Sequence, residues 1–147
     1  MKIAYLAMWD IYTPSGVCNK ISMQMEAMQR LGHEVAGFFV TPAGTDALVP
    51  VRAVAHFTAG KGKLVVLQRA LALRHLSREL AAWAPDLVYF RHCVYVPGLA
   101  RMLKDYPYIS EINSCEPKEF SNNSVRELGR LQMIPVTEII DTGIILE

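Results

Sequence analysis

Several features that define other protein classes are scarce in this sequence of 147 residues. The three cysteines, Cys18, Cys93 and Cys115, are odd in number and far apart, which excludes a disulfide framework and favours reduced thiols. No apolar run approaches the ~20 residues that a membrane-spanning helix needs. A formal net charge of +1 excludes a global field that would hold the chain on nucleic acid. We therefore expect a cytoplasmic protein that does not bind nucleic acid.

Two glycine-rich phosphate-binding motifs are also missing. The sequence contains neither the dinucleotide motif G-x-G-x-x-G nor the phosphate-loop motif G-x-x-x-x-G-K-[ST]. What is present is a composition of 52% hydrophobic and 20% charged residues, which is typical of a folded globular domain. The length suits a single domain spanning residues 1–147.

Hydrophobic periodicity predicts strands and helices that alternate along the chain. Short apolar runs predict the strands, and stripes at helical spacing, above all in 64–84, predict the helices. This alternation predicts an α/β fold, a Rossmann-like doubly wound parallel sheet in a three-layer α/β/α arrangement. Its core covers 1–115, and the tail 116–147 stays unassigned. The expected strands are 2–7, 34–40, 51–57, 86–90 and 106–112, and the expected helices are 17–31, 64–84 and 97–104.

Two helices carry clear apolar stripes. In 17–31 the stripe is preceded by Ser15 as a helix N-cap and followed by Gly32 as the closing glycine. In 64–84 the stripe ends at Pro85, which stops the helix. The stripe residues are Val17, Ile21, Met25, Met28 and Leu31 in the first helix, and Leu64, Leu67, Leu71, Leu73, Leu76, Leu80 and Trp83 in the second.

In an open parallel sheet, ligands bind beyond the carboxyl ends of the strands, where the strand order reverses. Ser15, Gly16 and Val17 would offer unpaired backbone N–H groups to an anion, or would form only a turn and a helix cap. Glu111 would face the cleft or pair with Arg91. The other candidate residues at this edge are Asp10, Asn19, His92 and Asn113. His92 would orient a sugar hydroxyl or carry a proton, or would be an ordinary loop histidine, and Asn113 would bind a hydroxyl group or cap the next turn.

Two further features allow alternatives. The three cysteines lie at this same edge with His92, which would suit zinc, but without close ligand spacing small buried side chains are the better interpretation, so we expect no metal. The basic residues of the 64–84 region would lie against an anionic membrane, or would form the solvated back of a core helix. They are Lys61, Lys63, Arg69, Arg74, His75 and Arg78.

The segments MKIAYLAMWDIYTPSGVCNKISMQMEAMQRLGHEVAGFFV and PDLVYFRHCVYVPGLARMLKDYPYISEIN together resemble the family-four retaining glycosyltransferases over about residues 1–115. The run R-L-G-H-E-V after an amphipathic helix is the most specific part of this resemblance. Such enzymes have two Rossmann-like halves in the GT-B arrangement. The resemblance implies that this chain is the N-terminal, acceptor-side half of such an enzyme, without the C-terminal half that binds the nucleotide sugar.

The resemblance also implies roles for individual residues. Ser15, Gly16 and Val17 would lie beside the phosphate and sugar of the donor, and His92 would be the catalytic residue that contacts the transferred sugar. Asp10, Asn19, Arg91, Glu111 and Asn113 would line the acceptor side, although the family more often has histidine at the position of Asn113. The implied partners are a nucleotide sugar, an acceptor and the missing C-terminal domain. No cofactor is implied.

Three functions are therefore compared. The first is half of a glycosyltransferase that transfers sugar with retention and is inactive alone. The second is a stand-alone module that binds a sugar or nucleotide without catalysis, which tight binding by this chain alone would favour. The third is an adaptor at the inner face of the membrane that attaches through the 64–84 helix.

Overall fold

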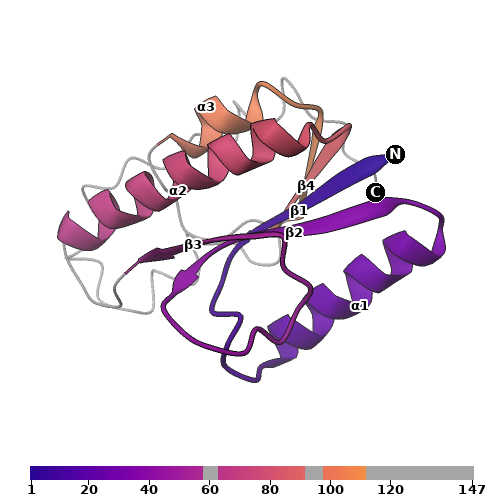
Figure 1. The fold of residues 1–147 in the computed structure, drawn as a ribbon, viewed down its shortest axis with the longest axis horizontal. Helices are drawn as coiled ribbons and strands as arrows, with labels where there is room; N and C mark the ends of the chain where they lie inside the picture. The colour runs from indigo at the N-terminus through magenta and orange to yellow at the C-terminus, as the bar shows by residue number, and fades with distance from the viewer. Residues whose placement is uncertain (58–62, 92–97, 112–147) are drawn as a thin grey trace, which may run out of the picture.

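The computed structural model describes residues 1–57, 63–91 and 98–111, and these form an α/β fold (Figure 1). Strands and helices alternate as the periodicity predicts, and most bounds agree within two residues. The tail 116–147 lies outside the described residues. The elements are β1 (Lys2–Met8), α1 (Gly16–Arg30), β2 (Glu34–Pro42), β3 (Ala53–Phe57), α2 (Lys63–Trp83), β4 (Leu87–Arg91), α3 (Leu99–Leu103) and β5 (Tyr108–Glu111).

The described strands form one five-stranded sheet in the order β3-β2-β1-β4-β5. All four strand pairs are parallel, so the predicted parallel sheet is confirmed. The chain adds β2 and β3 on one side of β1 and then returns to add β4 and β5 on the other side. The direction in which strands are added therefore reverses between β1 and β4.

Helices cover both faces of the sheet. In Figure 1, α1 lies on one face, and α2 and α3 lie on the other. Tyr5 and Ala7 of β1 pack in the core cluster that includes the buried residues of α1. Leu6, between them in sequence, packs in the cluster that contains residues of α2 and α3. Successive side chains of a strand point to opposite faces, which explains why the apolar run of β1 serves two cores.

Helix α1 ends as the sequence predicts, with one difference. Gly32 has a φ of +84°, a left-handed conformation that glycine adopts without steric cost. Its N–H donates to the carbonyl of Gln29 at 2.9 Å, and the N–H of His33 donates to the carbonyl of Met28 at 3.2 Å, which is the Schellman arrangement. The helix stops at Arg30, so Leu31 is an exposed cap residue and was wrongly expected in the apolar stripe.

Helix α2 buries a different face from the one expected at its start. The stripe was predicted to begin with Leu64, Leu67 and Leu71, but Leu67 and Leu71 are exposed. The side chain of Leu64 lies outside the described residues. The core face instead consists of Ala72, Leu73, Leu76, Leu80 and Trp83. At about 100° per residue, Leu67 and Leu71 lie too far around the helix to meet the sheet together with these residues.

Beyond the apolar face of α2, Arg74, His75 and Arg78 are exposed. Within the ranges described, no helix is long and apolar enough to cross a membrane. Helix α3 begins at Leu99 after Gly98, which has a φ of +92°. Pro97, where the sequence places the start of this helix, lies outside the described residues.

Candidate functional site

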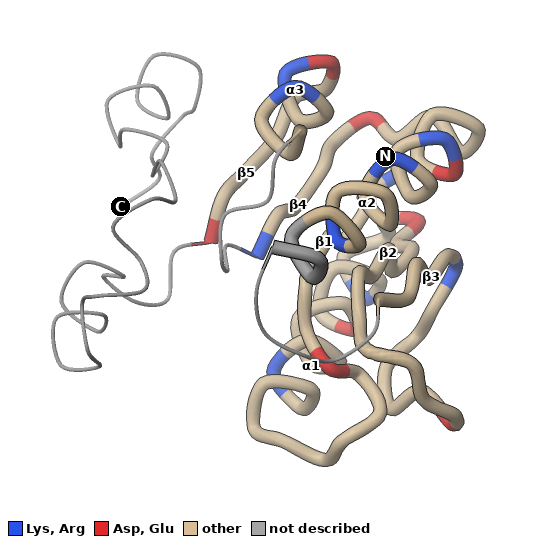
Figure 2. Tube along the Cα trace, turned by 90° about the vertical axis from the view of Figure 1, so that its left-hand side faces the viewer, with Lys and Arg blue, Asp and Glu red and all other residues tan. Residues whose placement is uncertain are grey.

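The sequence-predicted residues gather at the carboxyl ends of β1, β4 and β5. The loop of residues 9–15 leaves β1, Arg91 is the last residue of β4, and Glu111 is the last residue of β5. In Figure 2 the basic end of β4 and the acidic end of β5 lie at the same edge. Because the direction of winding reverses between β1 and β4, this is the edge at which ligands of open α/β sheets bind.

Asp10 shapes the loop after β1. One carboxylate oxygen accepts hydrogen bonds from the backbone N–H groups of Tyr12, at 3.0 Å, and Thr13, at 3.3 Å. The other accepts from the hydroxyl group of Thr13 at 2.8 Å. The backbone bond from Tyr12 and the Thr13 hydroxyl lower the pKa of Asp10 below its ordinary value, so it is ionised at neutral pH. Both oxygens of Asp10 therefore bind its own loop.

Ser15 caps α1 as predicted. Its hydroxyl oxygen accepts from the backbone N–H of Cys18 at 3.2 Å, and the indole N–H of Trp9 donates to the same oxygen at 3.4 Å. Gly16 and Val17 begin the helix, so their N–H groups have no partner within it. Asn19, whose backbone N–H donates to the carbonyl of Ser15 at 3.2 Å, has an exposed side chain one turn into the helix.

Neither backbone conformation nor packing requires glycine at position 16. No left-handed φ occurs there, and a Cβ added to Gly16 would meet no other described atom within 4 Å. Alanine would also favour the helix more strongly than glycine does. The absence of a side chain at Gly16 therefore leaves the start of α1 open to a close approach from outside the domain.

Cys18 joins the loop to the helix. Its thiol is buried and lies 3.3 Å from the carbonyl oxygen of Asp10 and 3.6 Å from that of Thr13. No group of three metal-binding side chains occurs in the part of the chain that the structure describes. The other proposed zinc ligands, Cys93, Cys115 and His92, lie outside that part.

Arg91 and Glu111 form an ion pair, so the structural alternative for Glu111 is the one observed. One guanidinium nitrogen of Arg91 lies 3.0 Å from each carboxylate oxygen of Glu111. Lys20 of α1 adds a second cation, with its Nζ 2.6 Å from Oε1. The side chains of Arg91 and Glu111 are only 11% and 14% exposed, against 48% for Lys20. Among the residues that the structure describes, this ionic cluster holds two cations, Lys20 and Arg91, around one carboxylate.

Three uncharged side chains extend this cluster under α1. Gln24 donates to Oε2 of Glu111 at 3.3 Å and accepts from the hydroxyl group of Tyr5 at 2.6 Å. Tyr89 donates to the same Oε2 at 3.3 Å, and its ring stacks on that of Tyr5 with centroids 5.2 Å apart. The whole group connects α1 to β1, β4 and β5 at the edge where the winding reverses.

Titration behaviour follows from this arrangement. Burial favours the neutral form of Glu111, but the hydrogen bond from Lys20 and the charge of Arg91 outweigh it and lower its pKa. Burial and the nearby negative charge of Glu111 raise the pKa of Tyr89 to about 12, and the same two causes raise that of Tyr5. At neutral pH the carboxyl group is therefore ionised and both phenols are neutral.

Sequence reasoning found only part of this cluster. Arg91 and Glu111 were candidates because they end strands, whereas Lys20, Gln24 and the tyrosine pair were missed. Lys20 and Gln24 are one helical turn apart, so their spacing gives them one face of α1, but only the packing of α1 on the sheet places that face over β4 and β5. His92 and Asn113 lie outside the described residues.

Two comparisons with known proteins found no relative of this chain. No protein-family model matches the sequence, and no curated protein matches it either.

Proposed function

We propose that this chain is the Rossmann-like, acceptor-side half of a retaining glycosyltransferase with GT-B architecture. The carrying observation is the reversal of strand winding between β1 and β4, at the edge where α1 begins with Gly16, whose added Cβ would meet no described atom within 4 Å. In this proposal the donor half binds the nucleotide, so the loop after β1 needs no glycine-rich motif. The resemblance over residues 1–115 supports the same assignment.

In this proposal, the described groups at the edge have different roles. Ser15, Gly16 and Val17 present N–H groups and the positive end of the helix dipole to the donor phosphate. Lys20 and Arg91 place two cations at the same edge, where they hold Glu111. Asp10 and Glu111 act by positioning, because their carboxylate oxygens bind the loop and the cluster.

The proposed reaction transfers a sugar to an acceptor hydroxyl group. The acceptor oxygen forms a bond to the anomeric carbon while the bond from that carbon to the phosphate oxygen breaks, and the nucleoside diphosphate leaves. The acceptor proton passes to a phosphate oxygen of the donor. Asn19, His92, Arg91 and Asn113 would orient the two substrates, and the chain alone, without a donor half, should not catalyse transfer at a useful rate.

A substitution at Gly16 tests this proposal in the enzyme that contains both halves. Gly16→Val should reduce transfer at least about a hundredfold, because its side chain would enter the space that the donor phosphate approaches. The fold should survive, since nothing in the described structure lies within 4 Å of the added Cβ. Met23→Val, at an exposed position of the same helix, is the matched control and should leave transfer unchanged.

Full activity of the Gly16→Val enzyme would contradict the role of this loop. Turnover of a nucleotide sugar by the 147-residue chain alone would contradict its assignment as one half of the enzyme. Tight binding of a nucleotide sugar by the isolated chain, without any gain of transfer when a donor half is added, would favour the non-catalytic binding module.

A further inference from the structure

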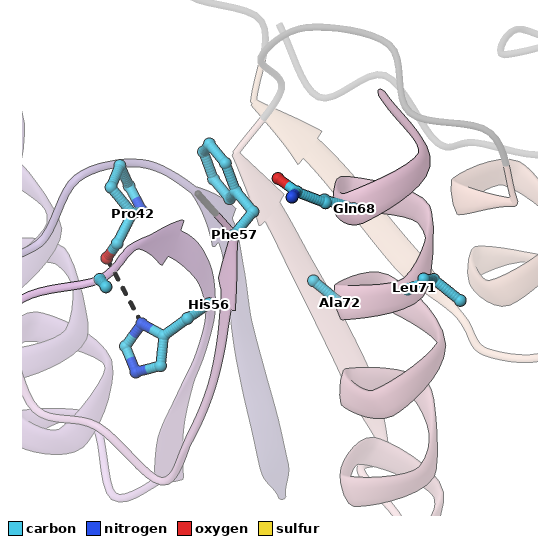
Figure 3. Close-up of a pocket in the computed structure, with 7 residues that line it drawn as sticks. Pro42, His56, Phe57, Gln68, Leu71 and Ala72 are labelled. Carbon is cyan, nitrogen blue, oxygen red and sulfur yellow. Dashed lines mark hydrogen bonds between the residues drawn. The ribbon is translucent and has the colours of Figure 1, made fainter. Parts of the chain in front are cut away.

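A second opening lies along the same edge of the sheet, at the carboxyl ends of β2 and β3 (Figure 3). We name it the β2–β3 pocket. Its volume of about 470 Å³ falls in the range of small-molecule sites, ~300–1,000 Å³. It is lined by Pro42, Ala43, His56, Phe57, Gln68, Leu71 and Ala72.

The walls of the β2–β3 pocket are mainly apolar. Leu71 contributes to the lining although it is 57% exposed, so the fold leaves an apolar side chain uncovered there. In Figure 3, the Gln68 side chain extends from α2 toward Phe57 at the end of β3. The guanidinium group of Arg69 lies 4.7 Å from the centroid of the Phe57 ring, which holds that ring through a cation–π contact. A mainly apolar wall of this size suits a ring-sized apolar group.

Tyr12 connects this pocket to the loop that Asp10 shapes. Its ring stacks on the imidazole of His56 with centroids 6.0 Å apart. The Nδ1 atom of His56 lies 3.4 Å from the carbonyl oxygen of Pro42, and because a carbonyl only accepts, Nδ1 is the donor. His56 is thus held between the loop after β1 and the end of β2, so the pocket adjoins the loop after β1.

Strand spacing sets how far apart the ends of β1 and β3 lie along the sheet. Neighbouring strands lie ~4.8 Å apart, and β3 is two strands from β1. Measured along the sheet, the ends of β1 and β3 are therefore about 10 Å apart. We propose that the pocket binds the apolar end of the acceptor, an elongated molecule that carries a ring-sized apolar group at the end remote from its reactive hydroxyl group. The identity of this ligand as the acceptor rests on the proposed function.

Two glucosides that differ only in their apolar part test this inference. 4-Methylumbelliferyl β-glucoside carries a planar ring system, and methyl β-glucoside has the same sugar without it. Binding to the 147-residue chain can be measured by fluorescence polarisation of the first and by its displacement with the second. We expect the aryl glucoside to bind at least tenfold more tightly. In NMR spectra of the protein, the backbone amide signals that shift when the aryl glucoside binds should be centred on Phe57, Gln68 and Ala72.

A matched pair of variants locates the binding. Leu71→Gln removes an apolar side chain from the pocket and should weaken binding of the aryl glucoside at least about fivefold. Leu67→Gln makes the same change one turn earlier, at a position that is 56% exposed and outside the lining, and should leave binding unchanged. Both positions are exposed and glutamine has a helix propensity close to that of leucine, so both variants should fold.

Equal affinity for the two glucosides, equal effects of the two variants, or amide shifts centred elsewhere would each overturn the proposed pocket. These results are independent of the glycosyltransferase assignment. If the ring-dependent binding holds but the two-domain enzyme transfers no sugar, only the proposed function fails. If transfer occurs and binding does not depend on the ring, only the pocket fails.

Discussion

Replacing Glu111 with glutamine would remove one negative charge from the ionic cluster while keeping the shape of the side chain. Arg91 would then stay largely buried without its counter-charge. Leaving a buried charge unpaired costs about 3–5 kcal/mol, and the remaining amide oxygen would recover part of this by accepting a hydrogen bond. Lys20 is half exposed, so losing its contact adds less than ~1 kcal/mol. We expect Glu111→Gln to lower the free energy of unfolding by about 2 kcal/mol at pH 7.

The control is an ion pair of similar length in an exposed position. Glu26 and Arg30 on α1 lie 2.6 Å apart, but their side chains are 57% and 74% exposed. Exposed pairs one helical turn apart contribute about 0.3–0.5 kcal/mol, so Glu26→Gln should have a small effect. Urea unfolding of both variants, compared at equal m-values, measures the difference. Equal losses of stability in the two variants would refute the argument that burial makes the Glu111 cluster strong.

Three further predictions follow from the same structure. Because the pKa of Glu111 is lowered on folding, the stability that its charge contributes is complete above its ordinary pKa of 4.5 and is lost as the pH falls through the lower folded value. The difference in free energy of unfolding between wild type and Glu111→Gln, measured by urea unfolding at several pH values, should therefore become smaller in acid. A difference that stays constant down to pH 2 would contradict this prediction. Gly32→Ala should destabilise the domain by about 1 kcal/mol because φ is +84°, whereas Gly16→Ala should change it by less than ~0.5 kcal/mol; thermal unfolding separates them, and equal effects would be unexpected. Ser15→Ala should cost about 1 kcal/mol through loss of the helix cap, with Ser15→Asp retaining most of the stability, and an alanine variant as stable as wild type would exclude the cap.

Predictions from the sequence succeeded where a residue acts through its neighbours in the chain. Ser15 and Gly32 were placed correctly because a helix cap and a closing glycine bind backbone groups within a few residues. The prediction failed for Leu67 and Leu71, which share an apolar character with the core stripe of α2. Leucines at helical spacing occur on both faces of this helix, so periodicity alone could not tell which face meets the sheet.

The candidate site shows the same limit. Arg91 and Glu111 could be selected because parallel strands end at a common edge. Their pairing depends on register, since Arg91 of β4 is directly opposite Glu111 of β5 in the sheet. Register and the placement of α1 also decide that Lys20 and Gln24 reach the same carboxylate. None of these contacts has a signature in local sequence, because the residues are up to 91 positions apart along the chain.

By itself, the sequence determined the alternating strands and helices, their bounds to within a few residues and the parallel α/β class, since hydrophobic period and turn residues act locally. Only the tertiary structure decided which face of each helix is buried, which strand lies beside β1, and which charges meet at the carboxyl ends of β4 and β5. The opening at the ends of β2 and β3 belongs to this second group, because it forms between side chains of two strands and a helix that no local pattern brings together. Such features depend on how separate elements pack, and packing is a property of the whole chain.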